Sequence, residues 1–149
     1  MGSMSKHEFS RMKNESRRIT NRSLLYPELS YLIQGAAFSV RNKYGRAHKE
    51  SIYQKAFAEE LELKKVIFKE QARIDIFSVT TGKKIGVYIP DFLVNDQIVI
   101  ELKAAQWTTK DMQAQFREYL KVSRYELGYL INFSEENFRP KRFIFTNDR

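Results

Sequence analysis

The chain has 149 residues, of which 42% are hydrophobic and 13% aromatic, which is enough for one folded core. The absence of cysteine excludes a disulfide framework, a thiolate zinc site and a cysteine nucleophile, and it fits a reducing compartment. No apolar run approaches the roughly 18 residues of a membrane span and no secretory signal opens the chain, so we expect a cytoplasmic protein without a membrane partner.

Positive charge dominates the chain, with a formal net charge of +8. Such a charge favours polyanionic partners, because neutralising phosphates releases condensed counterions, and nucleic acid is the obvious candidate. Six basic residues against two acidic ones give residues 1–22 half of that charge, +4. This segment lacks periodicity and opens with Met1-Gly2-Ser3, which is typical of a cloning remnant. We expect a flexible basic tail over 1–22, either solubilising or phosphate-binding, and one domain over 23–149.

Two helices are predicted first. One begins at Pro27-Glu28 and ends at Gly45, because apolar residues recur between them at steps of three and four. The other runs from Lys49 to Leu63, and Glu50 falls on the side of its buried face. The apolar stripe of this second helix consists of Tyr53, Phe57 and Leu61.

Three strands are predicted next. A period-two, β-branched pattern indicates a strand over Val66–Phe77, and turn-forming residues at 80–83 join it to a second strand, Ile85–Val94. After the turn at Asn95-Asp96, a short and largely buried strand is expected from Gln97 to Lys103.

A helix and two strands complete the chain. Thr108, with Asp111 three residues later, is a suitable N-cap for the helix. Leu127–Phe133 is apolar enough for a central strand, whereas Arg142–Thr146 is short and flanked by charge, as in an edge strand. This order predicts an α/β fold of the α+β kind, in which helices flank a central mixed sheet of about five strands. The inward face of the helix consists of Met112, Gln115, Phe116, Tyr119 and Leu120.

The tripeptide Glu101-Leu102-Lys103, ten residues after Pro90-Asp91, is the segment most indicative of a chemistry. Two carboxylates that converge at the end of a strand pair can hold a hard cation, and a neighbouring lysine can orient or help deprotonate an attacking water. The tripeptide alone is weak evidence, because Glu62-Leu63-Lys64 repeats it without a preceding Pro-Asp. We interpret that second copy as solvated helix surface.

The proposed site makes a demand on strand register. Alternation along a strand places Glu101 and Lys103 on one face, about 6 to 7 Å apart. With a two-residue loop, Asn95-Asp96, Asp91 would pair with Ile100 and point away from Glu101. A three-residue loop, Asn95–Gln97, or a one-residue bulge would set Asp91 beside Glu101, and we predict this second register.

Together these segments resemble the PD-(D/E)XK nuclease superfamily and, within it, the bacterial family labelled by the motif GxxExxY, over about residues 24–146. The chain departs from that family at Ala47, at His48-Lys49 and at Pro90, none of which is a carboxylate. The segments that carry the resemblance are Pro27–Tyr31 with Gly35–Phe38, Glu50–Tyr53, Asp91–Val94, Val99–Ala104, Gln115 with Tyr119-Leu120, and Gly128–Phe133.

The resemblance implies a restriction-endonuclease-like core and an endonuclease that hydrolyses DNA with Mg²⁺, for which Mn²⁺ would substitute. Asp91 and Glu101 would ligate the metal, with Glu50 and the backbone carbonyl of Leu102 as further donors. Lys103 would handle the attacking water, and Gln115 would face the site from the last helix. Contacts with nucleic acid are expected at Lys49, Trp107, Arg17 and Arg18.

Other interpretations stay open at this point. The fold could serve as a nucleic-acid-binding or assembly module with vestigial hydrolysis, against which the retained acid-acid-lysine set argues. The same centre could attack RNA, and cuts could come singly or in pairs through a homodimer. Asp91 could merely start a turn, Glu101 and Lys103 could be a solvated strand end, and Glu50 could cap its helix. Tyr53 is expected to be a packed aromatic rather than a catalyst.

Overall fold

The computed structural model describes residues 26–146. Residues 26–31 belong to one compact unit and residues 32–146 to another, which holds the sheet and the site discussed below. The predicted basic tail, with Arg17 and Arg18, lies outside the described residues. Within the described range, no helix has both the length and the apolar character of a membrane span.

Within residues 26–146, three helices form close to where the sequence predicts them. Helix α2 (Pro27–Tyr44) ends at Gly45, whose φ of +72° fits a glycine that follows a helix. Helix α3 (Glu50–Leu63) starts one residue later than expected, because Lys49 is its N-cap. Helix α4 (Lys110–Ser123) is capped by Thr109 rather than by Thr108, so the predicted cap was wrong by one residue. The Thr109 hydroxyl accepts a hydrogen bond from the Met112 N–H at 3.1 Å, whereas the Thr108 hydroxyl bonds to Asn132.

The central sheet has five strands in the spatial order β1-β4-β5-β6-β7. Strands β5 and β6 run parallel and every other neighbouring pair is antiparallel, so the sheet is mixed, as predicted. Strand β6 is buried along its whole length, and β7 is an edge strand, which confirms both expectations. The strands are β1 (Phe68–Glu70), β4 (Phe92–Val94), β5 (Ile98–Lys103), β6 (Leu127–Asn132) and β7 (Lys141–Ile144).

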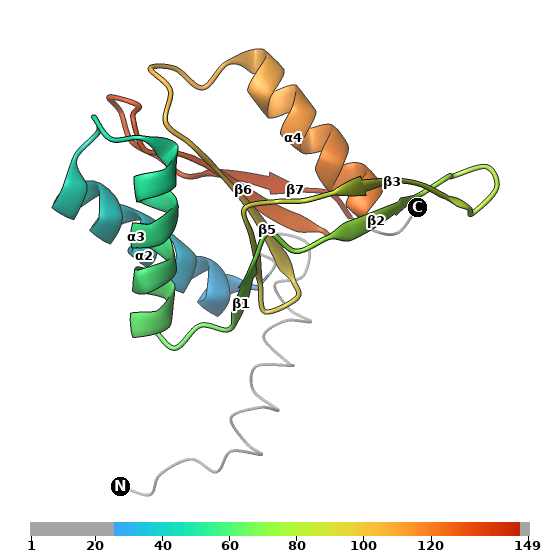
Figure 1. Ribbon diagram of the computed structural model, residues 1–149, viewed down its shortest axis with the longest axis horizontal. Coiled ribbons are helices and arrows are strands. Elements are labelled where there is room, and N and C mark those ends of the chain that lie inside the picture. The colour runs from blue at the N-terminus through green and yellow to red at the C-terminus, as the bar shows by residue number, and fades with distance from the viewer. Residues whose placement is uncertain (1–25, 147–149) are drawn as a thin grey trace, which may run out of the picture. The chain divides into compact units, whose positions relative to one another are not determined.

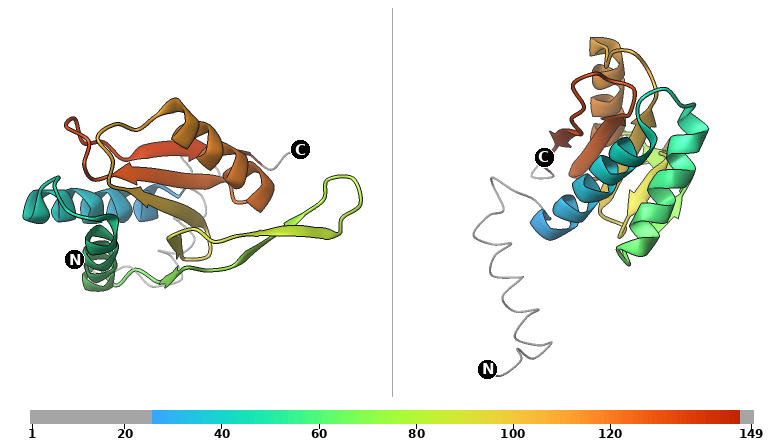
Figure 2. Two further views of the ribbon diagram at one scale, coloured as in Figure 1. Left: turned by 45° about the horizontal axis from the view of Figure 1, so that its top comes forward. Right: turned by 90° about the vertical axis from the view of Figure 1, so that its left-hand side faces the viewer.

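A two-stranded ribbon, β2 (Ile74–Phe77) with β3 (Lys84–Tyr88), extends away from the central sheet (Figures 1 and 2). The long strands predicted over 66–77 and 85–94 were therefore wrong, because each is broken into two. Pro90 has no N–H to donate to a ladder, and Gln71 adopts a positive φ of 53°. The two breaks meet where the Gln71 N–H donates to the carbonyl of Asp91 at 3.1 Å.

Helices cover both faces of the sheet (Figures 1 and 2). On one face, Tyr53 and Phe57 of α3 pack against Phe133 and Phe92, with ring centroids 4.7 and 5.1 Å apart. On the other face, Phe116 and other residues of α4 pack over β4, β5, β6 and the base of the ribbon. The site described below lies on this α4 face, because Glu101 is two residues after the α4-facing Val99 along β5 and therefore points to the same side of the sheet.

Gly128 in β6 lets α4 approach the sheet closely. A Cβ at this position would lie 2.7 Å from the ring of Phe116 and 3.2 Å from the carbonyl oxygen of Val99. We expect Gly128→Ala to lower the free energy of unfolding by about 1–3 kcal/mol, through overpacking, in urea titrations. Gly86→Ala is the matched control, because there the nearest atom is 4.0 Å away. Equal stability of the two variants would contradict the argument.

Candidate functional site

The hairpin of β4 and β5 has the register that brings the two acidic positions together. Its ladder pairs Phe92 with Ile100 and Val94 with Ile98, so the loop is the three-residue Asn95–Gln97. Asn95 and Asp96 take positive φ values of 51° and 54°, which asparagine and aspartate tolerate better than most residues. One step beyond the last pair, Asp91 lies opposite Glu101. The predicted odd register is confirmed.

Asp91 is attached to the end of β5 by its own side chain. Its Oδ2 accepts a hydrogen bond from the Leu102 N–H at 2.8 Å. Because the β4 ladder ends at Phe92, the carboxylate takes the place of the strand partner that this N–H would otherwise have. Asp91 Oδ1 lies 3.5 Å from the Gln71 side-chain amide, so the residue is held from both sides of the strand break. The end of the β4 ladder at Phe92 thus leaves the Leu102 N–H to the Asp91 carboxylate and fixes its orientation.

Glu101 is a largely buried carboxylate beside a second negative charge. Burial and the charge of Asp91 raise the pKa of Glu101 to about 7, while the hydrogen bond from Tyr88 and the charge of Lys103 lower it in part. The Tyr88 hydroxyl donates to Glu101 Oε1 at 3.0 Å. A cation shared with Asp91 would offset both the burial and the repulsion, so this carboxylate has the electrostatics of a metal ligand.

Glu50 faces the same centre from the first turn of α3. Partial burial raises its pKa, as does the charge of Asp91, while Lys103 lowers it. The residue is nevertheless exposed, so the prediction that it lies toward the buried face is only partly met. Within residues 26–146, no three acidic or histidine side chains are close enough to form a ligand cluster. The structure therefore pairs Asp91 with Glu101 and leaves Glu50 further out.

Lys103 and Gln115 share a small cavity with Glu101. The cavity has a volume of about 40 Å³. Lys103 lines it from β5, on the same face as Glu101, and Gln115 lines it from α4 as an exposed residue at its edge. A carboxylate, an amine and an amide thus surround one space, as expected from the alternation along β5 and the periodicity of α4. The other residues that line it are Tyr88, Met112, Phe116, Tyr119 and Leu130.

Tyr88 was not predicted as a residue of the site, and Tyr119 was predicted only to lie on the inward face of the last helix. Tyr88 belongs to the ribbon strand β3, and its ring stacks on that of Tyr119 with centroids 4.4 Å apart and an interplanar angle of 3°. Desolvation and the neighbouring carboxylate raise the pKa of Tyr88 far above its usual range, so its hydroxyl stays a donor. The only sequence indication was a tyrosine two residues ahead of Pro90-Asp91.

The remaining predicted residues, Lys49, Trp107 and Tyr53, do not line the cavity that contains Glu101. Lys49 is exposed at the start of α3, and Trp107 is 68% exposed in the loop between β5 and α4. Buried Asn132 holds that loop, because its Oδ1 accepts from the Ala105 N–H at 3.0 Å. Tyr53 is a packed aromatic, as expected, and its hydroxyl donates to the carbonyl of Gly45 at 2.7 Å.

The donor chemistry of the hairpin suits a hard divalent cation. Mg²⁺ is usually bound through one or two carboxylates together with waters and substrate phosphate. Asp91 and Glu101 supply two such carboxylates from adjacent strands, and a bound cation would offset the burial and the charge of Asp91 that raise the pKa of Glu101 to about 7. The pair therefore fits a metal without a third side chain.

Comparison with known proteins agrees with this geometry. No curated protein and no solved structure matches the chain. A sequence model of the PD-(D/E)XK nuclease superfamily matches residues 27–143, which span α2 to β7 and include the hairpin, the tripeptide and α4. The chain belongs to the PD-(D/E)XK nuclease superfamily.

Proposed function

We propose that the protein is a metal-dependent endonuclease that hydrolyses DNA phosphodiester bonds at a centre formed by Asp91, Glu101 and Lys103. The observation that carries the proposal is the β4–β5 register, which sets Asp91 opposite Glu101 and bonds its carboxylate to the Leu102 N–H. Membership in the superfamily supports a nuclease-type function on nucleic acid. A closer relationship to the GxxExxY family is part of the proposal.

Asp91 and Glu101 would hold Mg²⁺ or Mn²⁺, with Glu50 and the carbonyl of Leu102 as additional donors. A bound divalent ion lowers the pKa of its water and neutralises charge on the phosphodiester. The raised pKa of Glu101 sets a condition, because a carboxylate must ionise before it ligates strongly. Metal binding is therefore favoured above about pH 7.

The other residues of the centre have supporting roles in this proposal. Lys103 shares a strand face with Glu101, so its amine would orient the attacking water and compensate charge that develops on the phosphate. Gln115, across the cavity, would orient either the phosphate or the Lys103 amine. Lys49 and Trp107, both exposed, would contact the nucleic acid outside the cleaved bond.

Cleavage of different nucleic acids tests the proposal. Closed circular plasmid, linear duplex, single-stranded DNA and RNA would be incubated with Mg²⁺, Mn²⁺ or chelator. We expect the plasmid to be opened with either metal and to stay intact with chelator, because a closed circle can only be cut internally. Nicked circles as the first product would indicate single cuts, and linear product without them would indicate paired cuts by a homodimer.

Four results would contradict this assignment. Cleavage that persists in chelator would exclude the metal. Degradation of linear DNA without opening of the plasmid would indicate an exonuclease. Cleavage of RNA alone would indicate an RNA-directed enzyme, and the absence of any cleavage beside measurable binding would favour a binding module.

A further inference from the structure

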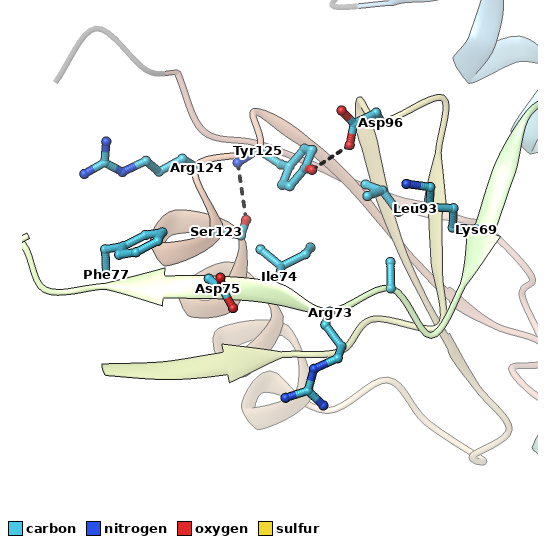
Figure 3. A pocket seen from close by; sticks show the side chains of 11 residues that line it. Lys69, Arg73, Ile74, Asp75, Phe77, Leu93, Asp96, Ser123, Arg124 and Tyr125 are labelled. Carbon is cyan, nitrogen blue, oxygen red and sulfur yellow. Dashed lines mark hydrogen bonds between the residues drawn. The ribbon is translucent and has the colours of Figure 1, made fainter. Parts of the chain in front are cut away.

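A second cavity, of about 580 Å³, lies between the ribbon strand β2 and the segment that follows α4 (Figure 3). We call it the basic groove and define it by Lys69, Arg73, Ile74, Phe77, Arg124 and Tyr125. Figure 3 shows Phe77 and Arg124 at one end and Lys69 at the other. It is much larger than the cavity beside Glu101, so it could accommodate an extended ligand.

The basic groove begins across the base of the ribbon from the candidate site. Ile74 lines the groove, and its cross-strand partner Tyr88 lines the cavity that contains Glu101 and Lys103. Neighbouring strands are about 4.8 Å apart. Leu93, two residues after Asp91, also lines the groove. A polymer bound at the candidate site would therefore need only a short further stretch to enter the groove.

The charges of the groove favour an anionic ligand. Lys69, Arg73 and Arg124 contribute three positive charges against two carboxylates, Asp75 and Asp96. Lys84 balances the charge of Asp75 in an ion pair of 3.2 Å, whereas Asp96 keeps its charge and accepts a hydrogen bond from the Tyr125 hydroxyl at 2.9 Å. The side-chain nitrogens of Lys69 and Arg73, by contrast, make no hydrogen bond or ion pair to any other residue in 26–146. Two cationic groups are thus available to phosphate, with Arg73 at the edge of the groove, where Figure 3 shows its guanidinium directed away from Tyr125.

Aromatic side chains in the groove distinguish a nucleic-acid strand from other polyanions. Phe77 is 44% exposed at one end, and Tyr125 lies along the wall with its hydroxyl on Asp96 (Figure 3). Cationic groups that follow a backbone, interleaved with aromatic rings on which bases stack, are the usual means of binding single strands. A nucleic-acid strand would use the charges through its phosphates and the exposed ring through its bases.

We propose that the basic groove binds the backbone of a nucleic-acid strand away from the cleavage centre, as a second contact for the substrate. The choice of nucleic acid as the ligand rests on the proposed function. Binding in the groove can nevertheless be tested separately, because it is measurable without hydrolysis. Lys69 and Arg73 would contact phosphates and Phe77 would stack on a base.

The test compares a groove variant, Lys69→Ala with Arg73→Ala, with a matched variant, Lys55→Ala with Arg139→Ala. The matched variant removes one lysine and one arginine that lie on α3 and on the β6–β7 loop. Binding of fluorescently labelled single-stranded DNA, duplex DNA and RNA would be followed by anisotropy in chelator at several salt concentrations. None of the substituted side chains is buried, and thermal melting would verify that each variant folds.

We expect the groove variant to bind single-stranded DNA several-fold more weakly than the parent. Its slope of log K against log salt should become shallower by about 1 for each phosphate that the protein no longer neutralises. The matched variant should retain the affinity and slope of the parent. A groove variant with the parental affinity and slope, or an equally weakened matched variant, would overturn the groove while leaving the proposed nuclease intact. A weakened groove variant of a parent that cuts nothing with Mg²⁺ or Mn²⁺ would support the groove and reject the nuclease.

Discussion

Replacement of Glu101 by glutamine is expected to reduce metal-dependent plasmid cleavage by at least about 100-fold, comparable to the removal of one essential electrostatic interaction in other hydrolases. Glutamine keeps the size of the side chain and an oxygen that can accept the hydrogen bond from Tyr88. It removes the negative charge, which leaves Asp91 as the only carboxylate of the pair. Initial rates at saturating Mg²⁺ would measure the effect.

Glu62→Gln provides a matched control, because the Glu62-Leu63-Lys64 copy of the tripeptide lies at the end of α3 with an exposed carboxylate. It should cleave at the parental rate. A comparable reduction in both variants, or an unchanged rate for Glu101→Gln, would reject Glu101 as a metal ligand.

Thermal melting separates this effect from unfolding. The pKa of Glu101 is about 7 in the folded protein against an ordinary value of 4.5, so its ionisation costs stability as the pH rises through that interval. Without metal at pH 8, Glu101→Gln should therefore melt at or above the temperature of the parent, and near pH 4 the two should melt alike. A variant that is inactive and equally stable has a defect in chemistry rather than in structure.

The parts of the fold that the sequence predicted depend on local patterns. The helix boundaries followed apolar periodicity and the residues at their ends, such as Pro27 and Gly45. The pairing of Asp91 with Glu101 followed from counting residues in one short hairpin loop, because a change of one residue turns every side chain to the other face. Such features need no knowledge of distant contacts.

The parts that the sequence did not predict depend on distant contacts. Pro90 could have indicated a broken strand, but the break at Gln71 has no sequence pattern and arises where its N–H meets the Asp91 carbonyl. Thr108 and Thr109 are equivalent as N-caps in sequence, and only the bond from Asn132 to Thr108 separates them. The exposure of Glu50 likewise depends on how α3 sits on the sheet, which periodicity does not define.

Tyr88 is the residue of the site that only the fold reveals. The ribbon base buries its ring, Tyr119 stacks on it, and its hydroxyl holds one oxygen of Glu101. With Oε1 held, Glu101 presents its other oxygen in a defined orientation, and partners of this kind are known to tune metal ligands. Because Tyr88 belongs to β3, the hydrogen bond also links the ribbon to the candidate metal site.

Replacing Tyr88 by phenylalanine should lower the affinity for Mn²⁺ by about 10- to 100-fold, the range found for removing a hydrogen-bond partner of a metal ligand. Phenylalanine keeps the ring that stacks on Tyr119. The hydrogen bond from Tyr88 lowers the pKa of Glu101, so without it that pKa should rise above about 7. Metal binding should then require a higher pH than in the parent. Calorimetric titration with Mn²⁺ from about pH 6 to about pH 9 would measure both effects, since this interval brackets the pKa of Glu101.

Tyr125→Phe tests whether the effect belongs to the site rather than to the removal of any tyrosine hydroxyl. Tyr125 donates to Asp96 at 2.9 Å, so this variant removes a tyrosine–carboxylate bond from the opposite end of the same β4–β5 hairpin. It should bind Mn²⁺ with the affinity and pH dependence of the parent. If Tyr88→Phe did so as well, Tyr88 would serve only in packing. If both variants bound Mn²⁺ equally weakly, the affinity for Mn²⁺ would depend on the overall stability of the hairpin. The hydrogen bond to Glu101 would then have no separate role.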